Sequence, residues 1–217
     1  MPSSVINPQL NETLAPYQFD AGVTISGSNL SGGTASLAPA QYGLKGWSFP
    51  VILASGTSAA ITTGSVYLSQ VTLPVNTTLA NIYYYQVGSA TALSTTASFA
   101  GVYFVNSSST AALVASTAAL TTTNFSTAAA TFKALPLTAQ YTTAATGTYY
   151  LALLIGATTG PTMGAPASIP PSTLLTGPVN AAAAYPFAIN GTGASTLPAT
   201  LTLSSNTAAV ALWAGCA

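Results

Sequence analysis

Gly147-Thr-Tyr-Tyr-Leu-Ala-Leu-Leu-Ile155 forms the most continuously apolar part of the chain. The apolar run from Tyr149 to Ala157 is about nine residues long, whereas a membrane-spanning helix needs about 18 or more. A short apolar run of this kind is typical of a central strand that is buried on both faces. The segment therefore predicts the middle of a sheet that other elements cover on both sides.

Shorter segments with the alternating pattern of strands lie on either side of it. The residues expected in strands are 66–73, 79–87, 98–105, 111–116, 131–137, 147–155, 185–189, 199–203 and 208–213. Residues 88–96 and the proline-rich residues 157–178 are expected to be loops. Many short strands at turn-separated intervals, with no alternation of strands and helices, favour an antiparallel β-sandwich or barrel. Surrounding Ser, Thr and Gly favour strand over helix for the alanine-rich residues 111–119.

Residues 1–41 differ in character from the rest of the chain. Prolines and a Gly/Ser-rich stretch at 26–33 interrupt them, and these residues disfavour helices and strands. Apolar side chains recur without a helical period at Val5, Ile6, Leu10, Leu14, Tyr17 and Phe19. The pattern predicts an extended arm, residues 1–41, that docks on a partner, followed by a folded domain at 42–217. A flexible tail is the alternative.

Charge is almost absent: the charged side chains of the 217 residues are Glu12, Asp20, Lys45 and Lys133. Nucleic-acid binding and attraction to anionic lipids both need clustered Lys or Arg, so neither is expected. No segment is long enough for membrane insertion as a helix. A chain with zero net charge has no electrostatic self-repulsion and tends to associate. We therefore expect an assembly rather than a free monomer.

Catalytic and cofactor-binding patterns are missing as well. The chain has no His, both carboxylates lie in the arm, and no glycine fingerprint for nucleotides occurs. Without His and with a single cysteine, no metal-ligand set is available. We expect no enzymatic activity, no cofactor and no metal. Cys216 is expected to be an inert residue of a terminal strand, with an intermolecular disulfide as the alternative.

Tyrosines occur in runs within two of the expected strands. Tyr83-Tyr84-Tyr85 and Tyr149-Tyr150 place neighbouring rings on opposite faces of a strand. One face goes to the core, and the other faces solvent, a neighbouring subunit or a glycan. All five are candidates for interface or glycan contact, while Trp47 and Trp213 are expected to be core anchors.

Several short motifs in a fixed order add a resemblance over residues 42–215. They are Tyr42-Gly-Leu-Lys-Gly-Trp-Ser-Phe-Pro50, Gly64-Ser-Val-Tyr-Leu, Phe99-Ala-Gly-Val-Tyr, Gly147-Thr-Tyr-Tyr-Leu, Tyr185-Pro-Phe-Ala-Ile-Asn-Gly-Thr192, Leu197-Pro-Ala-Thr-Leu201 and Ala211-Leu-Trp-Ala214. This order resembles a jelly-roll domain of virion proteins from tailed phages of actinobacteria, including minor tail proteins and capsid decorations. Pro50 replaces the Asp that usually follows the Trp-x-Phe segment in that family.

The resemblance implies an antiparallel jelly-roll β-sandwich without catalytic residues. A β-sandwich of this kind commonly associates as a trimer, so we expect a homotrimeric knob at the virion surface. The proline-punctuated arm, which lies outside the resemblance, is expected to attach the knob to a major capsid protein or another virion protein. The chain begins without a secretory signal pattern, which fits assembly in the host cytoplasm. The alternative is a minor tail protein, an adhesin whose tyrosines or 157–178 loop bind host cell-wall carbohydrate.

Overall fold

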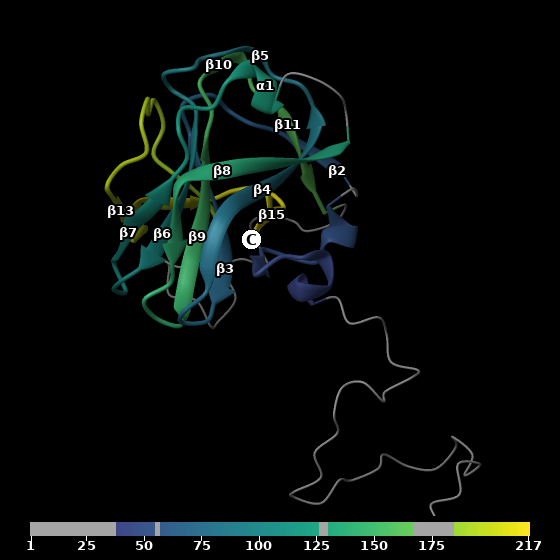
Figure 1. The fold of residues 1–217 in the computed structure, drawn as a ribbon. Coiled ribbons are helices and arrows are strands. Elements are labelled where there is room, and N and C mark those ends of the chain that lie inside the picture. Colours follow the sequence, from purple (N-terminus) through teal and green to yellow (C-terminus); the bar gives the residue numbers. More distant parts are fainter. Residues whose placement is uncertain (1–37, 55–56, 126–129, 167–184) are drawn as a thin grey trace, which may run out of the picture. The chain divides into compact units, whose positions relative to one another are not determined.

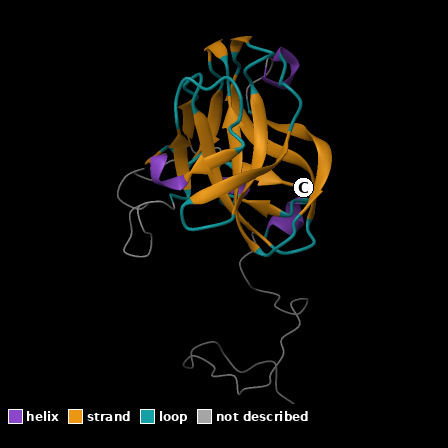
Figure 2. Ribbon diagram, turned by 90° about the vertical axis from the view of Figure 1, so that its left-hand side faces the viewer, coloured by secondary structure: helices purple, strands orange, loops and turns teal. Residues whose placement is uncertain are grey.

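The fold was determined as a computed structural model that describes residues 38–54, 57–125, 130–166 and 185–217. These residues form an antiparallel β-sandwich, and Figure 2 shows that strands make up most of it, with short helical turns at its periphery. The all-β antiparallel fold expected from the strand pattern is confirmed. The predicted arm lies almost entirely outside the described residues, which begin with Ala38 and the 3₁₀ turn η1 (Pro39–Tyr42).

Sheet B is built around the segment that predicted the fold. Its seven strands lie in the order β13-β7-β6-β9-β3-β12-β14, and every neighbouring pair is antiparallel. Their bounds are β3 (Val66–Leu73), β6 (Phe99–Val105), β7 (Thr110–Ser116), β9 (Gly147–Leu154), β12 (Phe187–Asn190), β13 (Thr200–Thr202) and β14 (Asn206–Ala208).

Sheet A packs against it around the long strand β4. Its order is β1-β15-β4-β11-β2, and β8 pairs with the other side of β4 (Figure 1). The bounds are β1 (Gly46–Trp47), β2 (Thr57–Ala60), β4 (Thr78–Gly88), β8 (Thr131–Thr142), β11 (Thr162–Ala165) and β15 (Ala214–Cys216). The remaining elements are the pair β5 (Thr91–Leu93) and β10 (Ala157–Thr159), helix α1 (Thr122–Phe125), and the 3₁₀ turns η2 (Val51–Leu53) and η3 (Leu203–Ser205).

Two of the turns that carry the chain between the sheets lie side by side. The β3–β4 turn leads from sheet B to sheet A, and the β8–β9 turn leads back. The two turns are joined to each other, since the Asn76 amide donates to the Thr143 carbonyl (2.9 Å) and the Thr143 amide donates to the Thr77 carbonyl (2.9 Å). On one flank, a bridge between Thr117 and Leu137 links the end of β7 to β8 and brings the two sheets together.

The core has one main layer between the sheets, a second layer on the far side of β9 and a smaller cluster around Trp213. Tyr149, Leu151 and Leu153 belong to the main layer, whereas Tyr150, Ala152 and Leu154 belong to the second. Tyr185, Ala194 and Leu197 pack over this second layer. Burial of β9 on both faces, which the continuous apolar run predicted, is therefore confirmed.

Three expectations about local structure were wrong. The expected loop at 88–96 contains β5, and the expected loop at 157–178 contains β10 and β11 in the part that the structure describes. Instead of one strand over 208–213, two short strands, β14 and β15, lie on either side of residues without regular structure. In both expected loops the strands are short and gain their stability from pairing with distant partners, such as β2 and β4 for β11.

Candidate functional site

The structure divides the five candidate tyrosines between the interior and one outer face. Tyr84, Tyr149 and Tyr150 are at most 1% exposed, so the hypothesis that they contact a subunit or glycan is wrong for them. Tyr83 and Tyr85 are half-buried and lie on the opposite face of β4 from Tyr84. The alternation of a strand accounts for this split, because Tyr84 points to the core where its neighbours point outward.

The two β9 tyrosines serve the packing of the sandwich. The Tyr150 hydroxyl donates to the Tyr185 carbonyl (3.0 Å), and the Tyr149 hydroxyl donates to the Ala145 carbonyl (2.9 Å). Burial raises the pKa of each of these two phenols to about 12. Both groups therefore stay neutral hydrogen-bond donors over the physiological range.

A row of aromatic rings lies on the outer face of sheet A. The ring of Phe132, from β8, lies 4.8 Å from the ring of Tyr85 and 5.1 Å from that of Trp213. The antiparallel register opposes Tyr85 and Phe132 directly, which brings strands β4 and β8 together at this point. We call the set Tyr42, Tyr83, Tyr85, Phe132 and Trp213 the aromatic face.

A pocket of about 290 Å³ opens in the aromatic face. The segment after η1 and the turn η2 form one wall, and sheet A forms the other; the lining residues are Tyr42, Gly43, Leu44, Val51, Tyr83, Phe132 and Trp213. Tyr42 and Phe132 are 47% and 48% exposed, so their rings are open to a partner. No lining residue carries a charge. The pocket therefore suits an uncharged group with apolar or aromatic surface.

The floor of this face contains a buried donor without an acceptor. Trp213 is 1% exposed, and its Nε1–H has no hydrogen-bond partner among the described residues. Sequence reasoning placed Trp213 correctly as a core anchor, while Trp47 is only half-buried and packs its ring 5.3 Å from that of Tyr42. Phe132 was not foreseen as a site residue, because its exposure depends on the β4–β8 register rather than on a motif.

A second hollow lies on the other side of the Tyr42–Trp47 pair. It measures about 400 Å³, and its lining includes Pro39, Lys45, Trp47 and Gln70. Lys45 is exposed and has no ion pair within the described part of the chain. This hollow thus places a positive charge next to the uncharged aromatic face.

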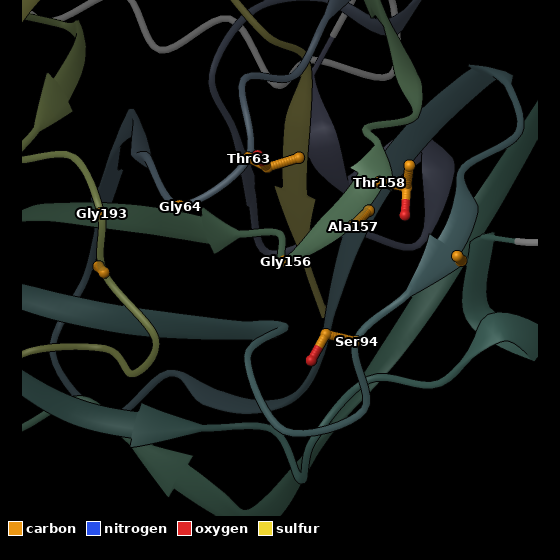
Figure 3. A pocket seen from close by; sticks show the side chains of 9 residues that line it. Thr63, Gly64, Ser94, Gly156, Ala157, Thr158 and Gly193 are labelled. Atoms are coloured by element: carbon orange, nitrogen blue, oxygen red, sulfur yellow. The ribbon is translucent and has the colours of Figure 1, made fainter.

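A third hollow, shown in Figure 3, is wide and shallow and has a volume of about 480 Å³. Its lining combines Gly64, Gly156 and Gly193 with small side chains, and the hydroxyl-bearing Thr63, Ser94 and Thr158 lie apart around it (Figure 3). It offers neither a ring to stack on nor a titratable group. We therefore regard the aromatic face as the stronger candidate site.

Catalytic or metal-binding constellations are not found in the described residues. No group of three or more His, Cys, Asp or Glu side chains gathers there. Cys216 is a free cysteine buried in β15, where its thiol lies 3.7 Å from the Gly46 carbonyl and burial raises its pKa to about 12. A buried, protonated thiol is unreactive, which fits the expected inert role rather than an intermolecular disulfide. Helices long and apolar enough to cross a membrane are likewise not found in this part of the chain.

The expected contact residues of the arm cannot be placed. Val5, Ile6, Leu10, Leu14, Tyr17 and Phe19 all lie outside the described residues.

Comparison with known proteins assigns no family. No protein-family model matches the chain, and no curated protein is significantly similar to it. The resemblance to phage jelly-roll proteins remains a prediction from the sequence.

Proposed function

We propose that this protein is a non-enzymatic structural protein of a virus particle, a jelly-roll knob on the surface of a phage capsid. The proposal is carried by an exposed aromatic face on a β-sandwich whose described residues contain only two charged side chains, Lys45 and Lys133. Exposed apolar surface of this kind marks an interaction site. An almost uncharged, fully β domain is suited to packing against other copies and other shell proteins.

In this proposal the knob is a homotrimer, and the arm attaches it to a major capsid protein or another virion protein. Zero net charge favours association, since copies do not repel one another. The sequence motifs at 42–215 support the phage assignment through their resemblance to jelly-roll virion proteins.

Removal of residues 1–37 tests the attachment. The cut precedes η1, whose Pro39 carbonyl accepts from the Leu44 amide (3.1 Å), so it leaves the described fold intact. We expect the shortened protein to fold, as measured by circular dichroism, but to be missing from purified particles. Its normal incorporation into particles would refute attachment through the arm.

A second candidate function is a tail adhesin that binds neutral carbohydrate of the host cell wall. The observation in its favour is the uncharged pocket of about 290 Å³ with aromatic walls. Binding on a glycan array that Phe132→Ser abolishes would support it. Electron microscopy of the particle separates the two functions, because a capsid knob is present in many copies around the head and a tail adhesin in a few at the tail.

A further inference from the structure

The described residues cover the aromatic face only in part, because Leu44 and Val51 pack against Trp213 while Tyr42 and Phe132 stay exposed. Four of the five large apolar side chains that stay exposed belong to it or to the adjoining turn η2: Tyr42 (47%), Ile52 (58%), Leu53 (45%) and Phe132 (48%). The fifth, Val75 (45%), lies on the β3–β4 turn. A concentration of exposed apolar groups on one face indicates that a partner covers it.

The distribution of charge along the chain indicates which partner covers the aromatic face. Both acidic side chains, Glu12 and Asp20, precede residue 38, whereas both basic side chains, Lys45 and Lys133, follow it. Lys45 is exposed in the hollow beside Trp47, and the Trp47 ring packs against Tyr42 of the aromatic face. The surface that needs covering is therefore bordered by a positive charge, and the chain's own N-terminal segment carries the matching negative charges.

The sequence Tyr17-Gln-Phe-Asp20 combines the groups that this surface would recognise. In an extended segment, alternate side chains point to opposite sides, so Tyr17 and Phe19 would share one side and Asp20 would face the other. Eighteen positions separate Asp20 from Ala38. At about 3.3 Å per residue they span up to roughly 60 Å, more than the roughly 40 Å diameter of a domain of this size. The segment is long enough to reach a neighbouring copy.

We propose that Tyr17 and Phe19 of one copy bind the aromatic face of a second copy, with Asp20 paired to Lys45 of that second copy. Each copy then gives one arm and receives one, and a closed ring of copies leaves no aromatic face uncovered. Aromatic side chains seated in an apolar pocket supply most of the affinity, while the exposed charge pair contributes mainly to register and encounter. The inference goes beyond the proposed function, since it needs no capsid or tail.

Competition by a free arm peptide tests the exchange on the full chain. We expect analytical ultracentrifugation of the full-length protein to show an oligomer at micromolar concentration. An excess of synthetic peptide 1–37 should convert it to monomers, and a peptide with Tyr17→Ser and Phe19→Ser should not. A full-length protein that is monomeric at every concentration, or an oligomer that ignores the peptide, would overturn the proposal.

Substitutions on the receiving surface provide the second test. Phe132→Ser should raise the dissociation constant of the oligomer roughly ten- to hundredfold, the range expected for exposing one buried aromatic ring. Val75→Ser is the matched control, since Val75 is 45% exposed and lies outside the aromatic face, and it should change the constant less than about twofold. Equal effects of the two substitutions would contradict the proposal. If Phe132→Ser does not fold, the peptide competition still decides.

The charge pair is tested by Asp20→Asn and Lys45→Gln. Each should weaken association by roughly two- to fivefold, and the double variant should be no weaker than either single one. Additive effects would show that the two groups do not pair. A full-length protein that is monomeric at every concentration would also contradict the homotrimer of the proposed function. An oligomer that ignores the peptide would overturn the arm exchange alone. Incorporation of the shortened protein into particles tests only the attachment to the virion.

Discussion

Cys216 allows a stability prediction that can be worked out from the structure. It lies in β15 between β1 and β4, is fully buried, and has its thiol 3.7 Å from the Gly46 carbonyl. Burial raises the pKa of this thiol from 9.0 to about 12, because the thiolate would lose its hydration. The fold therefore favours the neutral form, and alkaline pH should destabilise it through this residue.

The sign and size follow from proton linkage. A group whose pKa is raised in the folded state contributes its full stabilisation below its unfolded pKa, which is about 9 for this thiol. That stabilisation is lost as the pH rises through the folded pKa of about 12. For a shift of this size, the loss between neutral pH and about pH 11 amounts to roughly 3 kcal/mol. Cys216→Ala removes the titrating group and with it this part of the pH dependence.

Urea unfolding followed by circular dichroism at pH values from about 7 to 11 measures the effect. Cys216→Ala is expected to cost some stability at every pH from lost packing, which appears as a constant offset. The free energy of unfolding of the natural protein should fall more steeply with pH than that of the variant. Parallel curves for the two proteins would refute the burial argument for Cys216.

Four further predictions concern the core and the charges. Tyr150→Phe should lower the free energy of unfolding by about 1 kcal/mol, because the Tyr185 carbonyl loses its hydrogen-bond donor. Tyr84→Phe should leave it unchanged or raise it, because the buried Tyr84 hydroxyl has no partner among the described residues. Equal losses for the two variants would contradict this. Leu151→Ala should lower the free energy of unfolding by about 2–5 kcal/mol, since Leu151 is fully buried in β9. A loss below about 1 kcal/mol would contradict the burial of Leu151 in the core. The arm-deleted protein should keep the same unfolding free energy between about pH 5 and 8, because the described residues contain no Asp, Glu or His and the Cys216 effect begins at higher pH; a clear step in that range would disprove it. Its thermal midpoint should also change little between low salt and about 1 M salt, and a strong salt effect would contradict a fold held by apolar contacts and hydrogen bonds.

The sequence predicted those parts of the fold that local patterns determine. The bounds of β3 were correct, and β4, β6, β7 and β9 were correct to within a residue, because each is long, apolar on at least one face and bordered by turn residues. The short strands β5, β10 and β11 were missed because they carry no alternation long enough to recognise. They exist through pairing with residues far away in the chain, as in β10 with β5.

The candidate site was predictable only in part, for a related reason. The sequence indicated that neighbouring tyrosines lie on opposite faces of a strand and that one of these faces is open to a partner, which holds for Tyr83 and Tyr85 on β4. It could not indicate that the second face of β9 is covered as well, by the segment around Tyr185 and Leu197. Nor could it place Phe132 beside Trp213, since that neighbourhood arises from the register of β8 on β4 and the position of β15.

The small strand β1 would have a mechanical consequence if the arm attaches the domain to a particle, as we propose. Any pull transmitted along the chain from the arm reaches the sheets first at β1, which pairs only Gly46 with Cys216 and Trp47 with Gly215. Hydrogen bonds from Lys45 to the Cys216 carbonyl (2.7 Å) and from Ser48 to the Ala214 carbonyl (2.8 Å) secure it. Under load this ladder should open before β4 or β9 yields, lengthening the tether while the rest of the sandwich stays folded.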